Sequence, residues 1–243
     1  MIALKSISKG FSGQSILEDI SFEIENDDRL CIIGQSGSGK SVTMKLMTGL
    51  LVPDSGEIWV DDQNVTQFTT QEWNEKLINF GVVFQGAALF DSLNVLENVG
   101  IRMIEERLLP EAEIKERVEQ SLKLVGLDPD QMLMKFPSEL SGGMQKRVGI
   151  ARAIVNQPRY LFYDEPTTGL DPINANLIEA LIADLADKSN MTSVVITHDM
   201  HMVKTIATKV AFIHEKKLHF FGTPTEMLAS SDDIIQAFLS RST

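Results

Sequence analysis

The chain has 243 residues, carries 22 Lys and Arg against 34 Asp and Glu for a formal net charge of −12, and is 43% hydrophobic. This apolar content is sufficient for a buried core and excludes an intrinsically disordered chain. The acidic balance argues against a protein that coats nucleic acid or adheres directly to anionic lipid headgroups, but it leaves room for a small basic pocket that binds a nucleotide.

The N-terminal part of the chain alternates apolar and polar residues, a pattern that predicts antiparallel strands. Turn residues at Gly10, Gly13 and positions 26–28 separate these strands. Residues 30–33 are all apolar, which is typical of a strand buried on both faces. A glycine-rich turn and a helical pattern with Leu46 and Met47 on one side follow. This stretch therefore predicts a strand, a loop and a helix.

A second clear helix is predicted at residues 111–125, where apolar residues recur at helical spacing. These residues are Ile114, Val118, Leu122 and Val125. Glutamates occupy the first turn of this segment, and Gly126 is placed to cap its end.

The later part of the chain predicts a parallel α/β sheet. Apolar runs at residues 160–163 and 193–197 are typical of buried strands, and Leu177, Leu181 and Leu185 mark a helix between them. Residues 210–214 and 218–221 flank a polar turn and predict a hairpin. Because no linker is evident, we expect residues 1–243 to form one domain with a helical insertion at about residues 87–155.

The chain is expected to be a soluble intracellular protein. Its single cysteine, Cys31, excludes an internal disulfide and suits a reducing compartment. The longest apolar run, residues 80–90, covers 11 residues and is interrupted by Gln85. A membrane-spanning helix needs about 20 residues.

The strongest motif is the sequence GQSGSGKS at residues 34–41, which fits the phosphate-binding P-loop pattern. Glycines allow backbone N–H groups to converge on one point, and the following helix directs its positive end there. Lys40 adds a mobile cation for the terminal phosphates of a nucleotide, and the Ser41 hydroxyl is a ligand for Mg²⁺. A tight glycine turn before a helix is the alternative interpretation.

Two further segments carry groups that suit the same chemistry. Asp164 follows the apolar run at 160–163, where it can hold Mg²⁺, and the adjacent Glu165 can polarise an attacking water. A solvated turn is the alternative there. Ser141 and two glycines open a predicted helix and offer a second anion site, unless this is an ordinary capped helix. Since one phosphate is not easily shared by both anion sites within one chain, the second site suggests a neighbouring subunit.

In its order of motifs, the sequence resembles the nucleotide-binding subunits of ATP-binding cassette (ABC) transporters along essentially the whole chain. The motifs are the P-loop at residues 34–41, the Q-loop residue Gln85, the signature at residues 140–144, Walker B at residues 160–164 with Glu165, the D-loop at Leu170 and Asp171, and the switch histidine His198. The resemblance implies the ABC ATPase fold, with a P-loop NTPase core around a parallel sheet, an N-terminal antiparallel β subdomain and a helical insertion.

The resemblance also implies a dimer of two copies packed head to tail, with two ATP molecules between them. Each ATP would meet the P-loop of one copy and the signature of the other. The implied nucleotide-binding residues are Phe11, Gly34, Gln35, Ser36, Gly37, Ser38, Gly39, Lys40, Ser41, Val42, Gln85, Ser141, Gly142, Gly143 and Asp171. The implied Mg²⁺ ligands are Ser41, Gln85 and Asp164, and the implied catalytic residues are Glu165, His198 and Lys40.

Two positions depart from the common family pattern. Phe11 falls where the family places an adenine-stacking aromatic residue, usually Tyr, and a core Phe on an early strand is the alternative. Met144 replaces the Gln that most of the family carries in the signature, and a thioether cannot make the hydrogen bonds of that amide. Met144 and residues 86–93 are similar to the ATPases of Mla/Mkl-type phospholipid transport systems, whose partners are a membrane permease and an MCE-domain protein.

We therefore expect an ATPase that energises a membrane transporter, with phospholipid as its cargo and no nucleic-acid partner. It would lie at the cytoplasmic face of the inner membrane, held there by a permease helix that docks on apolar residues 87–93. The alternative for those residues is the core of the insertion. Other functions that remain open are transport of another substrate, a soluble ABC protein in translation or DNA repair, and a nucleotide-binding regulator without turnover. The chain lacks the second cassette or long coiled coil of the soluble class, and Glu165 and His198 argue against the regulator.

Overall fold

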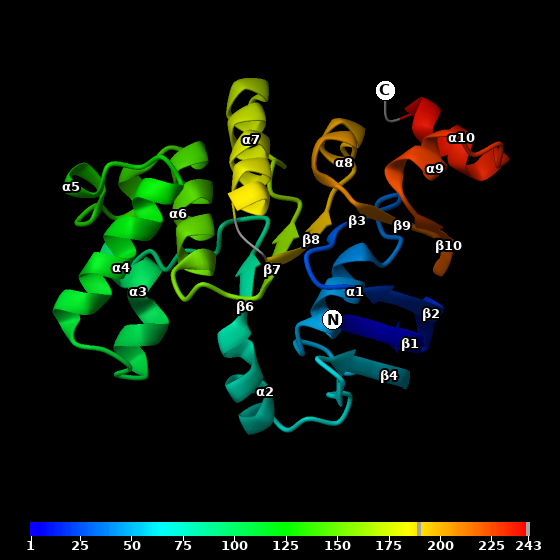
Figure 1. The fold of residues 1–243 in the computed structure, drawn as a ribbon, viewed down its shortest axis with the longest axis horizontal. Helices are drawn as coiled ribbons and strands as arrows, with labels where there is room; N and C mark the ends of the chain where they lie inside the picture. Colours follow the sequence, from blue (N-terminus) through cyan, green and yellow to red (C-terminus); the bar gives the residue numbers. More distant parts are fainter. Residues whose placement is uncertain (189–190, 242–243) are drawn as a thin grey trace. The chain divides into compact units, whose positions relative to one another are not determined.

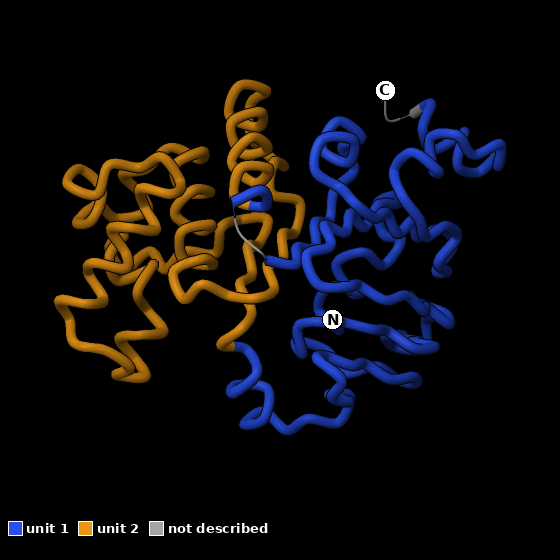
Figure 2. The backbone as a smooth tube through the Cα atoms, viewed as in Figure 1, with its two compact units in different colours: residues 1–77, 186–243 blue, residues 78–185 orange. Residues whose placement is uncertain are grey.

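The computed structural model describes residues 1–188 and 191–241 and contains two compact units (Figure 2). The first unit comprises Met1–Leu77 and Ala186–Thr243, and the second comprises Ile78–Leu185. Among the described residues, no helix is long and apolar enough to cross a membrane. The chain leaves the first unit after residue 77 and returns to it at residue 186, so the second unit is an insertion in the sequence of the first.

An antiparallel sheet lies in the first unit, as the alternating N-terminal pattern predicted. Its strand order is β2 (Gln14–Ile24), β1 (Ile2–Phe11), β4 (Ser55–Val60) and β5 (Gln63–Asn64). The prediction of a turn at Gly10 was wrong, because Gly10 lies inside β1 opposite Ser15. A Cβ atom at Gly10 would lie 2.8 Å from the Gln14 carbonyl oxygen, so this glycine permits close approach of two strands.

The first unit also contains a group of parallel strands. Strand β3 (Arg29–Ile33) is hydrogen-bonded in parallel to β8 (Thr192–Ile196) on one side and to β9 (Lys209–His214) on the other. Residues Leu30–Ile33 are buried, as expected for a strand covered on both faces. Strand β10 (Lys217–Gly222) pairs antiparallel with β9, which confirms the predicted hairpin.

Short helices complete the first unit (Figure 1). They are α1 (Lys40–Met47), α2 (Thr70–Lys76), α8 (Met200–Ile206), α9 (Pro224–Leu228) and α10 (Asp233–Arg241), and the 3₁₀ turn η1 (Leu77–Asn79) follows α2. Helix α1 begins directly after the glycine-rich loop, so the predicted strand, loop and helix are confirmed.

The second unit combines two parallel strands with helices. Strand β6 (Phe80–Val83) pairs with β7 (Tyr160–Asp164), and the ring of Phe80 stacks on that of Phe162 with centroids 5.6 Å apart. The helices are α3 (Val95–Glu105), α4 (Glu111–Leu124), α5 (Pro129–Met132), α6 (Gly142–Ile154) and α7 (Pro172–Lys188), with the 3₁₀ turn η2 (Pro137–Glu139). The end of α7, from residue 186, belongs to the first unit. Parallel strands and an antiparallel sheet in one chain confirm the predicted α/β class. Helices α3 to α6 fall within the stretch predicted as a helical insertion, and the single-domain assignment stays a prediction.

Helix α4 confirms its predicted stripe, because Ile114, Val118 and Leu122 are buried. Helix α7 confirms the helix predicted from Leu177, Leu181 and Leu185, and the structure shows which of its large apolar residues face inward. Leu177 is 47% exposed, whereas Ile178 is fully buried. An equal spacing of leucines cannot decide between two adjacent stripes when both contain large apolar residues.

The inward face of α7 yields a stability prediction. Substituting Ile178 by Ala should lower the free energy of unfolding by about 2–4 kcal/mol, because it leaves a cavity in the core. Substituting the neighbouring Leu177 by Ala should change it by less than about 0.5 kcal/mol. Urea unfolding followed by circular dichroism measures both. Equal losses for the two variants would contradict this assignment of the buried face.

Candidate functional site

The loop between β3 and α1 is shaped by glycines in conformations that other residues rarely adopt. Gly34 has φ of 152°, and a Cβ atom there would lie 2.3 Å from the backbone oxygen of Ile213 on β9. Gly39 has φ of 103°, and its Cβ atom would lie 2.4 Å from the side chain of Leu17 on β2. The loop is therefore held against β9 at its start and against β2 at its end, with no space for a side chain at either glycine.

The buried side chain of Lys40 forms hydrogen bonds with the backbone of this loop. Its ammonium donates hydrogen bonds to the backbone oxygens of Gly34 (2.9 Å) and Gln35 (3.0 Å), and the residue is only 6% exposed. Within the described part of the chain, the Ser38 hydroxyl is the one buried side-chain polar atom without a hydrogen-bond partner. An unsatisfied buried hydroxyl is unfavourable by about 1–3 kcal/mol. A cation and an unsatisfied hydroxyl at the start of a helix suit a phosphate group.

His198 lies on the same edge of the first unit's parallel strands as this loop. It follows β8 by two residues, whereas the loop follows β3, and these two strands are parallel neighbours. Ligand-binding residues of parallel sheets gather at the carboxyl ends of the strands. The His198 side chain is exposed at this edge.

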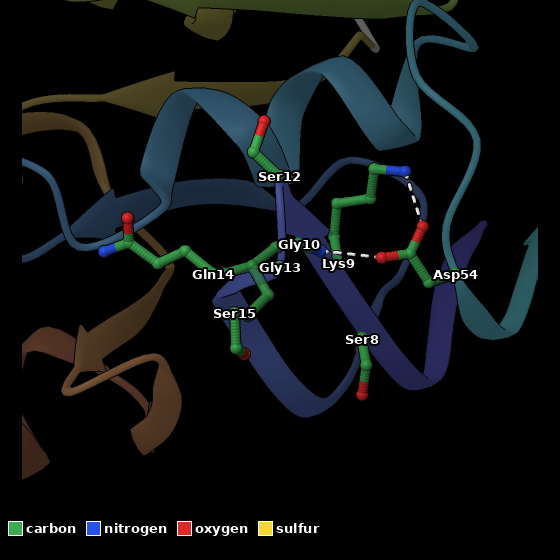
Figure 3. A pocket seen from close by; sticks show the side chains of 9 residues that line it. Ser8, Lys9, Gly10, Ser12, Gly13, Gln14, Ser15 and Asp54 are labelled. Carbon is green, nitrogen blue, oxygen red and sulfur yellow. Dashed lines mark hydrogen bonds and ion pairs between the residues drawn. The ribbon is translucent and has the colours of Figure 1, made fainter.

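Phe11 lies at the end of β1 and is 44% exposed, which removes the alternative of a core aromatic residue. The Lys9 ammonium lies 5.4 Å from the centroid of the Phe11 ring. Lys9 is itself held by Asp54, whose carboxylate accepts hydrogen bonds from the Lys9 ammonium (2.6 Å) and from the Gly10 backbone N–H (2.7 Å) (Figure 3). Lys9, Gly10 and Asp54 border an open cavity of about 330 Å³ beside the β1–β2 turn. The ion pair fixes a cation near one face of the Phe11 ring.

The second unit brings two carboxylates and an amide to the ends of its own parallel strands. Asp164 ends β7, and Glu165 follows it with φ of 45°, a left-handed conformation. The Thr168 hydroxyl donates a 2.9 Å hydrogen bond to the Glu165 carboxylate. Gln85 follows β6 by two residues and is exposed. Since Val83 of β6 lies opposite Tyr163 of β7, Gln85 and Asp164 belong to one edge.

A buried lysine of α6, Lys146, contacts Gln85. It is 6% exposed, and its ammonium donates a hydrogen bond to the backbone oxygen of Gln85. Burial lowers the pKa of Lys146, and the nearby carboxylates of Asp164 and Glu165 act in the opposite direction. A buried cation therefore lies near both the Q-loop residue and the two carboxylates.

The predicted signature motif forms the start of α6. The Ser141 hydroxyl accepts a hydrogen bond from the Met144 backbone N–H (3.3 Å), so Ser141 is the N-cap of the helix. A Cβ atom at Gly143 would lie 2.7 Å from the side-chain oxygen of Asn174. Asn174 in turn donates a 2.6 Å hydrogen bond to the Asp171 carboxylate, and this contact is the main cause that lowers the pKa of Asp171. The signature and the D-loop are therefore one packed cluster.

The predicted site residues thus form groups within the two units. The first unit holds Phe11, residues 34–42 and His198, and the second holds Gln85, Ser141, Gly142, Gly143, Asp164, Glu165 and Asp171. Sequence reasoning missed Lys9, Asp54, Lys146 and Asn174. A signal for Lys146 was present, because a charged residue stands at helical spacing with the buried Gly143, Ile150 and Ala153.

Comparison with known proteins identifies a family that the chain matches. Residues 17–168 match a family described as ABC transporter. The chain is 36% identical to a probable ribonucleotide transport ATP-binding protein, mkl, of Mycobacterium leprae, over 98% of its own length and 68% of that protein. It is also 36% identical to the intermembrane phospholipid transport system ATP-binding protein MlaF of Haemophilus influenzae, over 98% of its own length and 90% of that protein.

Among solved structures, the chain is similar to a dimeric ATP-binding cassette in a post-hydrolysis state bound to ADP and Pi. The TM-score is 0.84 at 28% identity, covering 92% of this chain and 99% of the other. The fold is therefore that of an ABC ATPase cassette, as the order of motifs predicted.

The glycine loop yields a prediction with a built-in control. Gly34→Ala should lower the free energy of unfolding by more than about 3 kcal/mol, because the new methyl group would overlap the Ile213 backbone. Gly37→Ala should lower it by only about 1–2 kcal/mol, since Gly37 shares a positive φ but faces open space. Urea unfolding distinguishes the two. A milder effect at Gly34 than at Gly37 would contradict the packing described for the loop.

Proposed function

This chain belongs to the ABC transporter family, and from that premise we propose that it is the ATPase subunit of a membrane transporter that moves phospholipid. The observation that carries the ATPase part is the loop at residues 34–41, where Lys40 and the unsatisfied Ser38 hydroxyl lie together at the start of a helix. The phospholipid part rests on the 36% identity to MlaF over 90% of that protein.

ATP binding is assigned first to groups of the first unit. The backbone N–H groups of residues 34–39 and the Ser38 hydroxyl would donate to the phosphate oxygens, and Lys40 would exchange its backbone acceptors for the terminal phosphates. Phe11 would stack on the adenine with the ring face that Lys9 leaves open. His198 would contact the terminal phosphate from the end of β8.

Mg²⁺ is assigned to Ser41, Gln85 and Asp164. A hydroxyl, an amide oxygen and a carboxylate are hard oxygen ligands of the kind that this ion takes, and phosphate oxygens and water would complete its coordination. The bound ion would neutralise charge on the phosphates.

Hydrolysis is assigned to Glu165. Its carboxylate would accept a proton from a water molecule as the water oxygen attacks the terminal phosphorus, and the bond to the bridging oxygen breaks to release ADP with the electron pair. The Thr168 hydroxyl donates a hydrogen bond to one carboxylate oxygen of Glu165. Positioning by Thr168 would limit the conformations that the carboxylate samples.

The complete site would form between two copies packed head to tail. The N-terminal end of α6, with Ser141 and Gly142 exposed, would face the terminal phosphate held by the partner copy. Asp171 lies in the same cluster and would contribute at this interface. Met144 uses its backbone N–H for the helix cap, so loss of the usual Gln side chain leaves that cap intact. The dimeric state of the similar solved cassette supports this arrangement.

A permease helix would dock beside Gln85. Phe90 is 52% exposed, and Leu89 and Leu93 are half-buried. The buried Asn98 holds this segment, since its side chain accepts from the Phe90 N–H (2.8 Å) and donates to the Leu93 oxygen (2.8 Å). An apolar ring held rigidly at the surface is typical of a protein contact. Docking would place the chain at the cytoplasmic face of the inner membrane, with an MCE-domain protein as a further partner.

The first test concerns Glu165. Glu165→Gln should retain ATP binding and lower the rate of phosphate release by about 10²–10⁴-fold, because the amide keeps the shape but cannot accept the proton. Titration with a fluorescent ATP analogue and a phosphate-release assay measure the two properties. Glu105→Gln, an exposed position on α3, is the matched control and should match the unmodified protein. Unchanged hydrolysis in Glu165→Gln would refute the assigned role.

The second test concerns the partner and the cargo. Phe90→Asp should release the protein from membranes, because burial of one aromatic side chain stabilises an interface by several kcal/mol, roughly 25 cal/mol per Å². Leu124→Asp, on the equally exposed Leu124 of α4 (56%), should leave membrane association unchanged. The unmodified complex is then purified from membranes, and its companion chains and bound small molecules are identified. Co-bound phospholipid with an MCE-domain chain supports the proposal, whereas a ribonucleotide or a soluble solute-binding protein contradicts the assigned cargo.

A further inference from the structure

Helix α6 holds the segment that follows β6 by two cationic side chains on one face. The Lys146 ammonium donates to the backbone oxygen of Gln85. Six residues further along the helix, the Arg152 guanidinium donates to the backbone oxygens of Ala87 and Ala88, both at 2.7 Å. Gly149 stands between these cations, and a Cβ atom there would lie 3.3 Å from the Ala87 side chain. Residues 85–88 are thus contacted from three positions on α6, namely 146, 149 and 152, which are three residues apart.

The segment held by α6 has a backbone conformation that is unfavourable without these contacts. Ala87 has φ of 60° and Ala88 has φ of 48°, so two consecutive residues with side chains are left-handed. Each such residue is unfavourable by about 1–2 kcal/mol. The fork of Arg152 reaches both of their carbonyl oxygens, and Ala87 is buried against α6. The contacts with α6 therefore select this turn over relaxed alternatives.

The hydrogen bonds of both cations go to backbone carbonyls, and the carboxylates of Asp164 and Glu165 lie near Lys146 as well. Lys146 is buried and Arg152 is half-buried, so each gives up hydration that only well-placed acceptors can replace. A methionine of similar length would fill the same space without that penalty. The charge at these two positions is thus matched to the carbonyl oxygens of residues 85, 87 and 88.

We propose that Lys146 and Arg152 are positioning residues that clamp the Gln85–Ala88 turn to α6, so that Gln85, the exposed Phe90 and the signature at the start of α6 move as one body. This inference rests on the proposed function, in which Gln85 binds Mg²⁺ and Ser141 faces the partner's ATP. A displacement of Gln85 on nucleotide binding would then reach the docking surface and the signature together. Without the clamp, Gln85 could move independently of Phe90 and the signature.

The clamp is tested first by amide hydrogen exchange on the full chain without nucleotide. Lys146→Met and Arg152→Met should each speed exchange of the amides of residues 86–93 by roughly tenfold, the effect of losing a hydrogen bond to a charged donor. Arg147→Met is the matched control, because Arg147 lies on the same helix and contacts Gly126 instead. Exchange in residues 86–93 should be unchanged in that variant.

Conservative variants keep the test decisive if a methionine variant does not fold. Lys146→Arg retains a donor and should exchange like the unmodified protein. Arg152→Lys retains the charge but not the fork, so it should show an intermediate rate. If the Met variants fold and exchange at residues 86–93 is unchanged, the clamp is overturned. If Arg152→Met does not fold, unchanged exchange in Arg152→Lys overturns it instead.

The link to the reaction is tested by the Mg²⁺ dependence of ATP hydrolysis. Lys146→Met should raise the half-saturating Mg²⁺ concentration by roughly fivefold while ATP-analogue affinity without Mg²⁺ stays unchanged. Combining it with Gln85→Ala should add nothing to the effect of Gln85→Ala alone, because Lys146 acts through Gln85. Additive effects would overturn the positioning role. If Gln85→Ala alone behaves like the unmodified protein, the metal assignment fails, while faster exchange in Lys146→Met would still support the clamp.

Discussion

Parallel pairing of largely buried strands is the constraint on which the rest of this structure depends. The middle residues of β3, β8, β9 and β7 are apolar and buried, so they carry no polar chemistry. Parallel direction brings the carboxyl ends of neighbouring strands to one edge, so the first polar residues after each strand meet there. The phosphate-binding loop and His198 follow this rule in the first unit, and Gln85 and Asp164 follow it in the second.

Cations directed at backbone carbonyls recur at the loops that leave these strands. Lys40 donates to the Gly34 and Gln35 oxygens, Lys146 to that of Gln85, and Arg152 to those of Ala87 and Ala88. Each cation joins a helix to the loop beside it, and none of these contacts is an exposed ion pair of the kind that contributes little. In a chain with a net charge of −12, these few cations give local positive character where anionic ligands would bind.

The loops differ in how their unusual backbone is stabilised. The P-loop uses glycine at its left-handed positions, so no steric penalty arises there. The turn after Gln85 places alanines in the left-handed region, and the opposing contacts of α6 hold it. Glu165 is also left-handed, with its side chain held by Thr168. Rigid placement of polar groups is thus obtained by glycine in one loop and by side-chain hydrogen bonds in the others.

The sequence by itself determined the features that depend on local chemistry. Largely apolar runs identified β3, β7 and β8, helical spacing identified α4, and the glycine and lysine pattern at residues 34–41 identified the phosphate loop. Only the tertiary structure decided which stripe of α7 faces inward, that Gly10 lies inside a strand, and that Lys146 and Arg152 reach the turn after Gln85. The physical reason is the distance along the chain between the interacting residues. A turn or a helix depends mainly on neighbouring residues. In contrast, the tertiary fold determines which face is buried, where two strands approach closely, and which hydrogen bonds span 61 or more residues.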